Sequence, residues 1–179
     1  RAVAYGWKQE ALAENAQIKA KLQKGVTKAT HRTSLQVFEK LTTVVDGERR
    51  IVDQPPLLMH LIDRETGLRR VHPAYQRYHD SLNRDRQHLL EQFAIVDAAF
   101  KVVGVGSVGT RCHIILLEGR TTQEPLFLQV KEADDSVLSP YLGPSAFRHR
   151  GERVVQGQRL MQAASDLFLG WTSLGRVHF

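Results

Sequence analysis

A run of three glycines between two β-prone segments constrains the fold of this chain more than any other feature. The run is Gly104-Val-Gly106-Ser-Val-Gly109, and it separates Lys101-Val-Val103 from a β-branched and apolar segment over 110–117. A third β-prone segment, 126–131, follows the polar turn 119–125. Because apolar and β-branched residues flank the glycines, the sequence predicts a strand, a glycine loop, a second strand, a turn and a third strand.

Glycine loops bind phosphate groups in several folds, and the residues around the loop distinguish these folds. A dinucleotide-binding loop opens a helix, and a Walker A loop carries Lys-Ser or Lys-Thr after its last glycine. Here Thr110 and Arg111 follow Gly109 and continue into a predicted strand, which argues against both types. The GXXG loop of KH domains joins two helices, so it does not fit either. The remaining type is the glycine-rich loop of protein kinases, a strand–loop–strand hairpin that covers the phosphates of ATP.

A kinase-type loop also requires a lysine on the following strand, and Lys131 is in the expected place. It ends the third β-prone segment, where burying its ammonium group without an anionic partner would be costly. The alternative is a lysine at the end of a strand that reaches solvent. With the loop and this lysine taken together, we expect the nucleotide phosphates to be contacted by Gly104, Gly106, Ser107, Gly109 and Lys131.

A carboxylate that holds this lysine is expected on the next helix, and Glu152 is the candidate. The sequence predicts that helix from Glu152 to about Asp166, with Gly151 or the residue before it at its start. Glu152 then lies in the first turn, where an acid also stabilises the helix dipole. An ion pair with Lys131 and this simpler role both remain open.

The rest of the chain divides by its hydrophobic periodicity into two parts. Residues 1–97 are expected to be mainly helical, with a β-hairpin near 42–52 that turns at Asp46-Gly47. Residues 98–179 are expected to form a kinase-like small lobe. Helices are predicted over 7–24, over 34–40, from Pro73 onward and over 84–93, and C-terminal strands over 167–171 and 176–179.

The charge distribution leaves a second class of function open. The chain carries 25 Lys and Arg against 19 Asp and Glu, a net charge of +6, and residues 1–50 hold 10 of these basic and 5 of these acidic residues. A basic stretch can bind the phosphates of nucleic acids, but its lysines also fit a solvated helix face, which we prefer. The alternative function is a non-catalytic binding or regulatory module whose basic N-terminal region contacts nucleic acid or another polyanion.

Cysteine count and hydropathy exclude several other classes. Cys112 is the only cysteine, which excludes an internal disulfide and a multi-cysteine zinc site, and we expect it to be a buried structural thiol. No apolar stretch approaches the ~20 residues that span a bilayer, and no secretory leader is visible. We therefore expect a cytoplasmic protein without membrane contact. Arg1 is not an initiator methionine and the C-terminus has no cap or tail, so the chain is expected to be a fragment of a longer polypeptide.

Several long runs of residues resemble the bacterial domain-of-unknown-function family 2252. The similarity extends over about residues 31–179, and its most distinctive runs are 101–111, 125–133, 136–144, 151–166 and 168–171. The family resembles protein-kinase-like and aminoglycoside-phosphotransferase-like folds. The resemblance implies a catalytic loop, Gly-Asp-x-His-x-x-Asn, and a metal-binding loop, Asp-x-Asn-Asp-Phe-Asp, upstream of the part seen here. Neither segment occurs in this chain.

Together these observations predict an α+β fold. A kinase-like nucleotide-covering lobe of antiparallel strands, a glycine-rich loop and one packed helix would follow a mainly helical segment. The expected ligand is ATP with Mg, whose metal ligands are not in this chain, and the remainder of the longer chain would supply the other lobe. The complete protein would then be a phosphotransferase with an unidentified acceptor, whereas this chain alone lacks the catalytic and metal-binding loops.

Overall fold

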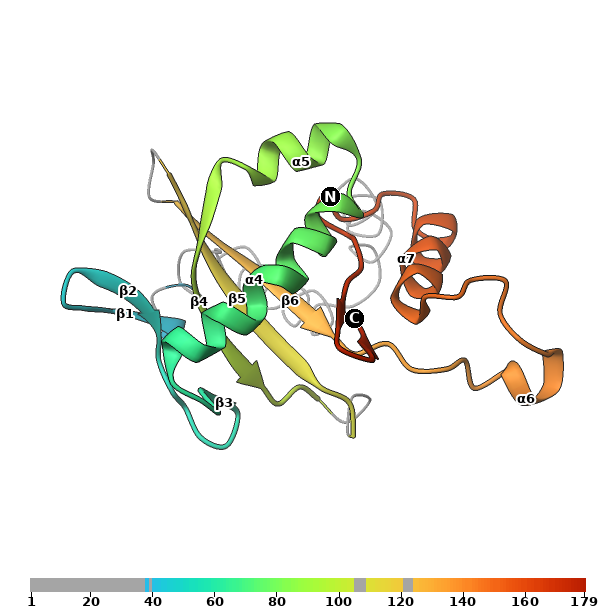
Figure 1. The fold of residues 1–179 in the computed structure, drawn as a ribbon, viewed down its shortest axis with the longest axis horizontal. Coiled ribbons are helices and arrows are strands. Elements are labelled where there is room, and N and C mark those ends of the chain that lie inside the picture. The colour runs from blue at the N-terminus through green and yellow to red at the C-terminus, as the bar shows by residue number, and fades with distance from the viewer. Residues whose placement is uncertain (1–37, 39, 105–108, 121–123) are drawn as a thin grey trace, which may run out of the picture. The chain divides into compact units, whose positions relative to one another are not determined.

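The computed structural model describes residues 38, 40–104, 109–120 and 124–179 (Figure 1). The chain divides into two compact units, Arg1–Leu41 and Thr42–Phe179, and the elements below all belong to the second. The helix predicted over 7–24 lies outside the described residues, as does nearly all of the helix predicted over 34–40.

The predicted β-hairpin is formed by β1 (Thr42–Val45) and β2 (Glu48–Ile51). Its turn residues Asp46 and Gly47 have φ angles of 53° and 79°. A two-residue hairpin turn of this type requires positive φ at both positions, which glycine adopts freely and aspartate tolerates. The hairpin prediction is therefore confirmed, together with its turn.

The main sheet is antiparallel and consists of β3 (Leu58–Met59), β4 (Phe93–Lys101), β5 (Cys112–Gly119) and β6 (Pro125–Lys131), in that order (Figure 1). β5 and β6 lie where the sequence predicts its second and third strands. Residues 102–111, which include the three glycines, connect β4 to β5, so the predicted order of the strands is confirmed, while the glycine loop itself stays a prediction. A β-bulge in β4 shifts the register between Ile95 and Asp97.

β4 begins earlier than the sequence predicts, and the helix before it is shorter. The predicted helix over 84–93 ends at Leu90, since α5 spans Arg84–Leu90, and the strand predicted over 101–103 already ends at Lys101. Phe93 packs against the buried core in an extended conformation, so tertiary contact outweighs the local helical periodicity there.

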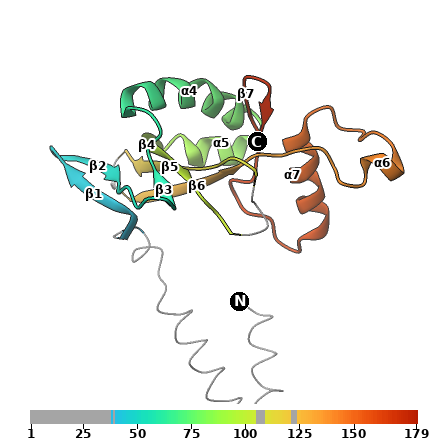
Figure 2. The same cartoon turned by 90° about the horizontal axis from the view of Figure 1, so that it is seen from below.

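α4 (Arg64–Asp80) lies across one face of the sheet (Figure 2). The prediction that Pro73 begins this helix is wrong, because the helix begins a full two turns earlier, where the carboxylate of Asp63 accepts the N–H of Thr66 at 2.9 Å. Pro73 lies inside the helix, where it lacks the N–H of an intrahelical hydrogen bond. The N-cap and the packing of the following turns on the sheet outweigh that loss.

One cluster of the hydrophobic core lies between this face of the sheet, α4 and α5. Its buried centre is Leu82, Leu90, Ile115 and Leu117. Side chains alternate between the two faces of a strand, so the odd-numbered residues of β5 and the even-numbered residues of β6 face α4. The partly buried residues packed around this centre are Val71, Tyr75, Tyr78, Phe93, Ile95, Ala98, Leu126, Leu128, Val130 and Phe168.

The predicted strand over 167–171 is wrong, because this segment is irregular and bonds to side chains of α4 and of the residue after it. The hydroxyl of Tyr78 donates to the Phe168 carbonyl at 2.6 Å, and the Trp171 N–H donates to Ser81 Oγ at 3.0 Å. The backbone at Gly170 lies close to these side chains, because a Cβ on Gly170 would come within 2.9 Å of the Tyr78 and Leu82 side chains. These tertiary bonds satisfy backbone groups that a strand would otherwise pair.

The C-terminal region also contains α6 (Ser139–Leu142), α7 (Arg150–Met161) and a short hairpin of β7 (Ser173–Leu174) and β8 (Val177–His178). α7 is the helix predicted from residue 152, but it ends before Asp166. β8 confirms the strand predicted over 176–179.

At this level the α+β prediction is confirmed, with antiparallel sheets and helices in the described part of the chain. The boundary predicted between residues 97 and 98 lies inside β4, and Thr42–Phe179 forms one compact unit. Of the helices described here, none combines the length and apolar character needed to cross a bilayer.

Candidate functional site

The three glycines of the predicted loop belong to the segment between the last residue of β4 and the first of β5. Gly104 precedes its tip and Gly109 follows it, and both are exposed. Gly109 has a φ of +87°, a conformation that a side chain would strain. The tip itself, which includes Gly106 and Ser107, lies outside the described residues.

The register of the sheet places Lys131 beside this loop. Lys131 pairs with Cys112, the first residue of β5 after the loop. On the other side of β5, Phe100 pairs with His113, so Lys101 comes beside Cys112 as well. Two lysines from neighbouring strands therefore flank Cys112 at the loop end of the sheet.

The charges of both lysines act on the Cys112 thiol. Burial raises the pKa of Cys112, and the positive charges of Lys131 and Lys101 oppose that rise. Because side chains alternate along each strand, these three residues lie on the face of the sheet away from α4. Lys131 is exposed there, whereas Cys112 is buried, as the sequence predicts for a structural thiol.

Another charge near Lys131, that of Glu132, is paired with Arg111. The Arg111 guanidinium lies 3.1 Å from one Glu132 carboxylate oxygen, and the Arg111 N–H donates to the other at 2.8 Å. This pair ties the start of β5 to the end of β6. Since Arg111 and Glu132 offset each other, the positive charge at the loop end of the sheet comes from Lys101 and Lys131.

Glu152 is in the first turn of α7, as predicted, and the described residues show no ion pair between it and Lys131. The Glu152 N–H donates to Nδ1 of His149 at 3.2 Å, and its carboxylate raises the pKa of that imidazole against the larger lowering by burial and by His178. The structure thus shows Glu152 beside the helix N-terminus, and its role toward Lys131 stays a prediction.

The described residues do not fit a magnesium site. They contain no group of three or more His, Cys, Asp and Glu side chains able to hold a metal ion. The acidic pair that follows Lys131 most closely in the sequence is Asp134 and Asp135. It lies beside Arg150, whose guanidinium is 2.7 Å and 2.8 Å from the two Asp135 carboxylate oxygens. The Asp135 carboxylate is thus paired with Arg150, whereas Asp134 is 3.9 Å from the same guanidinium.

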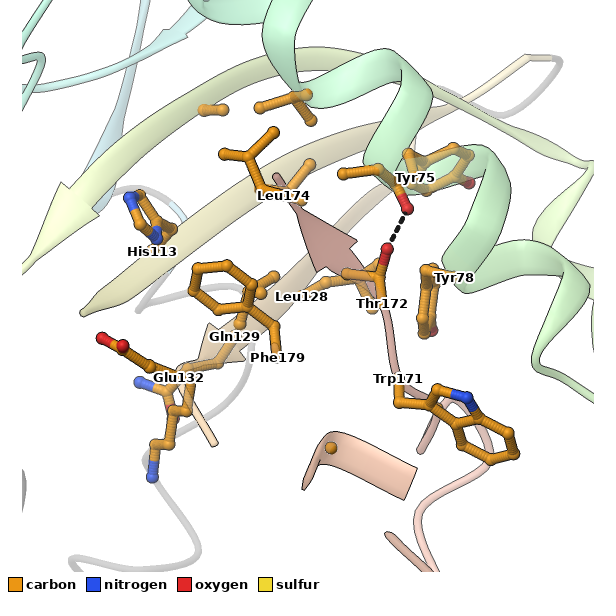
Figure 3. A pocket seen from close by; sticks show the side chains of 18 of the residues that line it. Tyr75, Tyr78, His113, Leu128, Gln129, Glu132, Trp171, Thr172, Leu174 and Phe179 are labelled. Atoms are coloured by element: carbon orange, nitrogen blue, oxygen red, sulfur yellow. Dashed lines mark hydrogen bonds between the residues drawn. The ribbon is translucent and has the colours of Figure 1, made fainter. Parts of the chain in front are cut away.

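A cavity of about 810 Å³ lies between α4, the sheet, α7 and the segment 168–172 (Figure 3). Aromatic side chains provide much of its lining, including Tyr75, Tyr78, Trp171 and Phe179. Burial raises the pKa of Tyr75 to about 12 and raises that of Tyr78 further, so both phenols stay neutral at physiological pH. Burial also lowers the pKa of His113 in the same wall. The cavity has the size of an ordinary ligand pocket, and its lining combines these aromatic groups with charged residues such as Arg70, Lys131 and Asp166.

Sequence reasoning missed Lys101 and the cavity, for different reasons. The position of Lys101 beside Cys112 could have been predicted from their distances to the glycine run. Lys101 is three residues before the first glycine, and Cys112 is three residues after the last. Such symmetric positions pair in a hairpin. The cavity depends on segment 168–172 folding back against α4, which no local pattern in the sequence indicates.

These features define an α+β protein with an antiparallel sheet in which Lys101 and Lys131 lie on either side of Cys112, at the end where β4 connects to β5. The chain belongs to the family described as uncharacterized protein conserved in bacteria (DUF2252), whose model matches residues 2–179. The family resemblance stated from the sequence is thereby confirmed and extended toward the N-terminus. Neither the comparison with curated proteins nor the comparison with solved structures gives a match.

Proposed function

We propose that this chain binds ATP in a kinase-like manner, with the glycine loop over the phosphates and Lys131 in contact with them. The observation that carries the proposal is the pairing of Lys131 with Cys112, which puts an exposed ammonium group beside the returning end of the loop. In a kinase-type site the lysine is needed there, because it contacts the α- and β-phosphates while loop amides cover them.

Lys101 strengthens the electrostatic part of the proposal. It brings a second positive charge to the same face and end of the sheet, as its effect on Cys112 indicates. Phosphate oxygens bind well where backbone N–H groups and cations converge without competing carboxylates. Glu132 does not compete, because its two oxygens already bind Arg111.

The proposed contribution of this chain is to hold the nucleotide rather than to transfer its phosphate. A catalytic aspartate loop, the magnesium ligands and the phosphate acceptor would come from the remainder of a longer polypeptide. Glu152 is proposed to steady Lys131 once nucleotide is bound. The cytoplasm, where ATP is abundant, is the proposed location.

Calorimetric titration with Mg-ATP tests the proposal, using the complete polypeptide and its Lys131→Ala variant. Loss of one charge-assisted contact, about 1.5–3 kcal/mol, should weaken binding by about 10- to 150-fold. Arg69→Ala is the control, because Arg69 is an exposed cation on α4 that pairs with Glu65. Folded protein that binds no Mg-ATP, or equal binding by wild type and Lys131→Ala, would contradict the proposal.

The alternative function, polyanion binding by the basic residues 1–50, makes a different prediction in the same experiment. Binding to a duplex oligonucleotide would weaken steeply with salt and would survive Lys131→Ala. The excess of basic residues in that part of the chain is the observation that favours it.

A further inference from the structure

Among the described residues, β6 is the last strand of the main sheet, and only one of its two edges pairs with a neighbouring strand there. In an antiparallel pair, the N–H and C=O of alternate residues point to the neighbour and those of the others point away. Two hydrogen bonds at the ends of the β5–β6 ladder show which residues of β6 point their backbone groups toward β5 and which point them away. The Gly119 N–H donates to the Glu124 carbonyl and the Glu132 N–H donates to the Arg111 carbonyl, both at 2.8 Å.

Even-numbered residues of β6 therefore bond to β5, and odd-numbered residues direct their backbone groups to the outer edge. The next odd residue after the strand confirms this, because the Ala133 N–H donates to the His178 carbonyl at 2.8 Å. One end of the edge is thus already bonded to extended backbone. Going back along the strand, the outward N–H and C=O of Lys131 and Gln129 have no partner within the described part of the chain.

The outward backbone groups of Gln129 and Lys131 open into the cavity. Gln129 and Lys131 both line it, although their side chains lie on the face of the sheet away from α4. The cavity therefore reaches around the edge of β6, where the backbone groups are. Val154 and Gln158 of α7 form part of the facing wall, together with segment 168–172.

We infer that this edge of β6 binds an extended peptide from a partner protein, which adds a strand to the sheet. Main-chain hydrogen bonds to Gln129 and Lys131 would give affinity, and the two faces of the added strand would give specificity. The peptide would extend the pattern already present at Ala133, whose N–H donates to the backbone carbonyl of His178 at the same edge.

The surroundings of the edge define the chemistry of the peptide. Its side chains would point alternately to the two faces of the sheet. On the α4 face they would enter the cavity beside Tyr75, Leu128 and Trp171, which favours apolar residues (Figure 3). On the other face they would lie beside the exposed Lys131 ammonium, which favours acidic residues. The partner segment therefore alternates apolar and acidic residues.

Backbone variants of one residue separate strand addition from other modes of binding. Gln129→Pro removes the outward N–H and leaves the ladder to β5 intact, since proline is tolerated on an edge where no ladder bond is lost. Gln129→Ala keeps that N–H and is the matched control. A displayed library of seven-residue peptides, selected on the complete polypeptide, should enrich alternating apolar and acidic sequences. Their affinity should be unchanged by Gln129→Ala and at least about tenfold weaker for Gln129→Pro.

Amide hydrogen exchange provides the direct readout. Without peptide, the Gln129 and Lys131 amides should exchange fast while the Leu128 and Val130 amides are protected, and a selected peptide should protect all four. Protection of Gln129 and Lys131 before any peptide is added would overturn the proposal, because the edge would then be filled within the polypeptide. Failure to select any peptide that distinguishes Gln129→Pro from Gln129→Ala would overturn it as well.

Discussion

The backbone N–H of Ile51 donates a 2.8 Å hydrogen bond to Oδ2 of Asp97, a carboxylate that is only 1% exposed. This bond joins β2 to β4 just after the β-bulge. His60 adds a second connection, because its Nε2 lies 3.2 Å from both Asp97 oxygens and its Nδ1 lies 2.7 Å from Asp53. Asp97 of β4 therefore holds both the first hairpin and His60, the residue that follows β3.

Replacing this carboxylate should destabilise the protein strongly. Asp97→Ala leaves the Ile51 N–H and the His60 ring without their buried acceptor, so we expect a loss of about 3 kcal/mol in the free energy of unfolding. Urea denaturation measures it. The control is Asp85→Ala, whose carboxylate is largely exposed, and its effect should stay within about 0.5 kcal/mol. Similar small effects for both variants would show that the Asp97 network contributes little.

Two glycines of α7 should respond to alanine in opposite directions. A Cβ on Gly151 would strike the backbone carbonyl of Phe179, whose carbon would be 2.8 Å away, whereas one on Gly157 meets nothing within 4 Å. Gly151→Ala should cost about 1–3 kcal/mol through overpacking. Gly157→Ala should stabilise by about 0.5–1 kcal/mol, because alanine loses less entropy in a helix. Thermal unfolding of the pair distinguishes the two, and a Gly151→Ala variant as stable as the wild type would contradict the packing of Phe179 on α7.

Stability should fall in mild acid through His149. Its Nδ1 accepts the Glu152 N–H, and its ring stacks on His178 with centroids 4.2 Å apart. Burial, followed by the charge of His178, lowers the His149 pKa below the ordinary value of 6.5. The unfolded chain therefore takes up this proton first, so the stability that the neutral ring contributes is present above that value and lost as the pH falls below it.

The variant His149→Asn tests this pH dependence. Asparagine caps a helix well but does not titrate. The midpoint of urea unfolding of the variant should therefore change less between pH 7.5 and 5 than that of the wild type. Equal pH profiles for the two proteins would exclude His149 as the source of the acid sensitivity.

Alkaline titration should separate the tyrosines. The pKa of Tyr75 is raised to about 12 by burial, whereas Tyr141 is 83% exposed. A folded pKa above the unfolded value means that stability holds below about pH 10 and is lost as the pH rises toward 12. Ultraviolet absorbance of phenolate should show a late step that Tyr75→Phe reduces. Ionisation of every tyrosine near pH 10 in the folded protein would contradict the burial of Tyr75.

Local signals allowed some elements to be predicted from the sequence. Asp46-Gly47 specifies a tight turn by backbone conformation alone, so the first hairpin was predictable. β5 and β6 were predictable because their apolar runs are bounded by glycines and a polar turn. Lys131 could be selected as a candidate residue because it ends such a run.

Other features depend on contacts that no local pattern contains. Pro73 is usually a helix start, yet the Asp63 cap and the packing of α4 on the sheet place it in the middle of a helix. Residues 167–171 look like a strand but bond to the side chains of Tyr78 and Ser81. Lys101 and the open edge of β6 become visible only when the register of the sheet is known.

Lys131 belongs to both surfaces proposed for this chain, because its ammonium group lies on the loop face while its backbone lies on the outer edge of β6. The acidic residues of a peptide and the phosphates of a nucleotide would thus compete for one cation. Thermodynamic linkage requires each ligand to reduce the affinity for the other by the same factor. A partner protein that occupies the edge would then act as a negative effector of nucleotide binding, and ATP would in turn promote release of that partner.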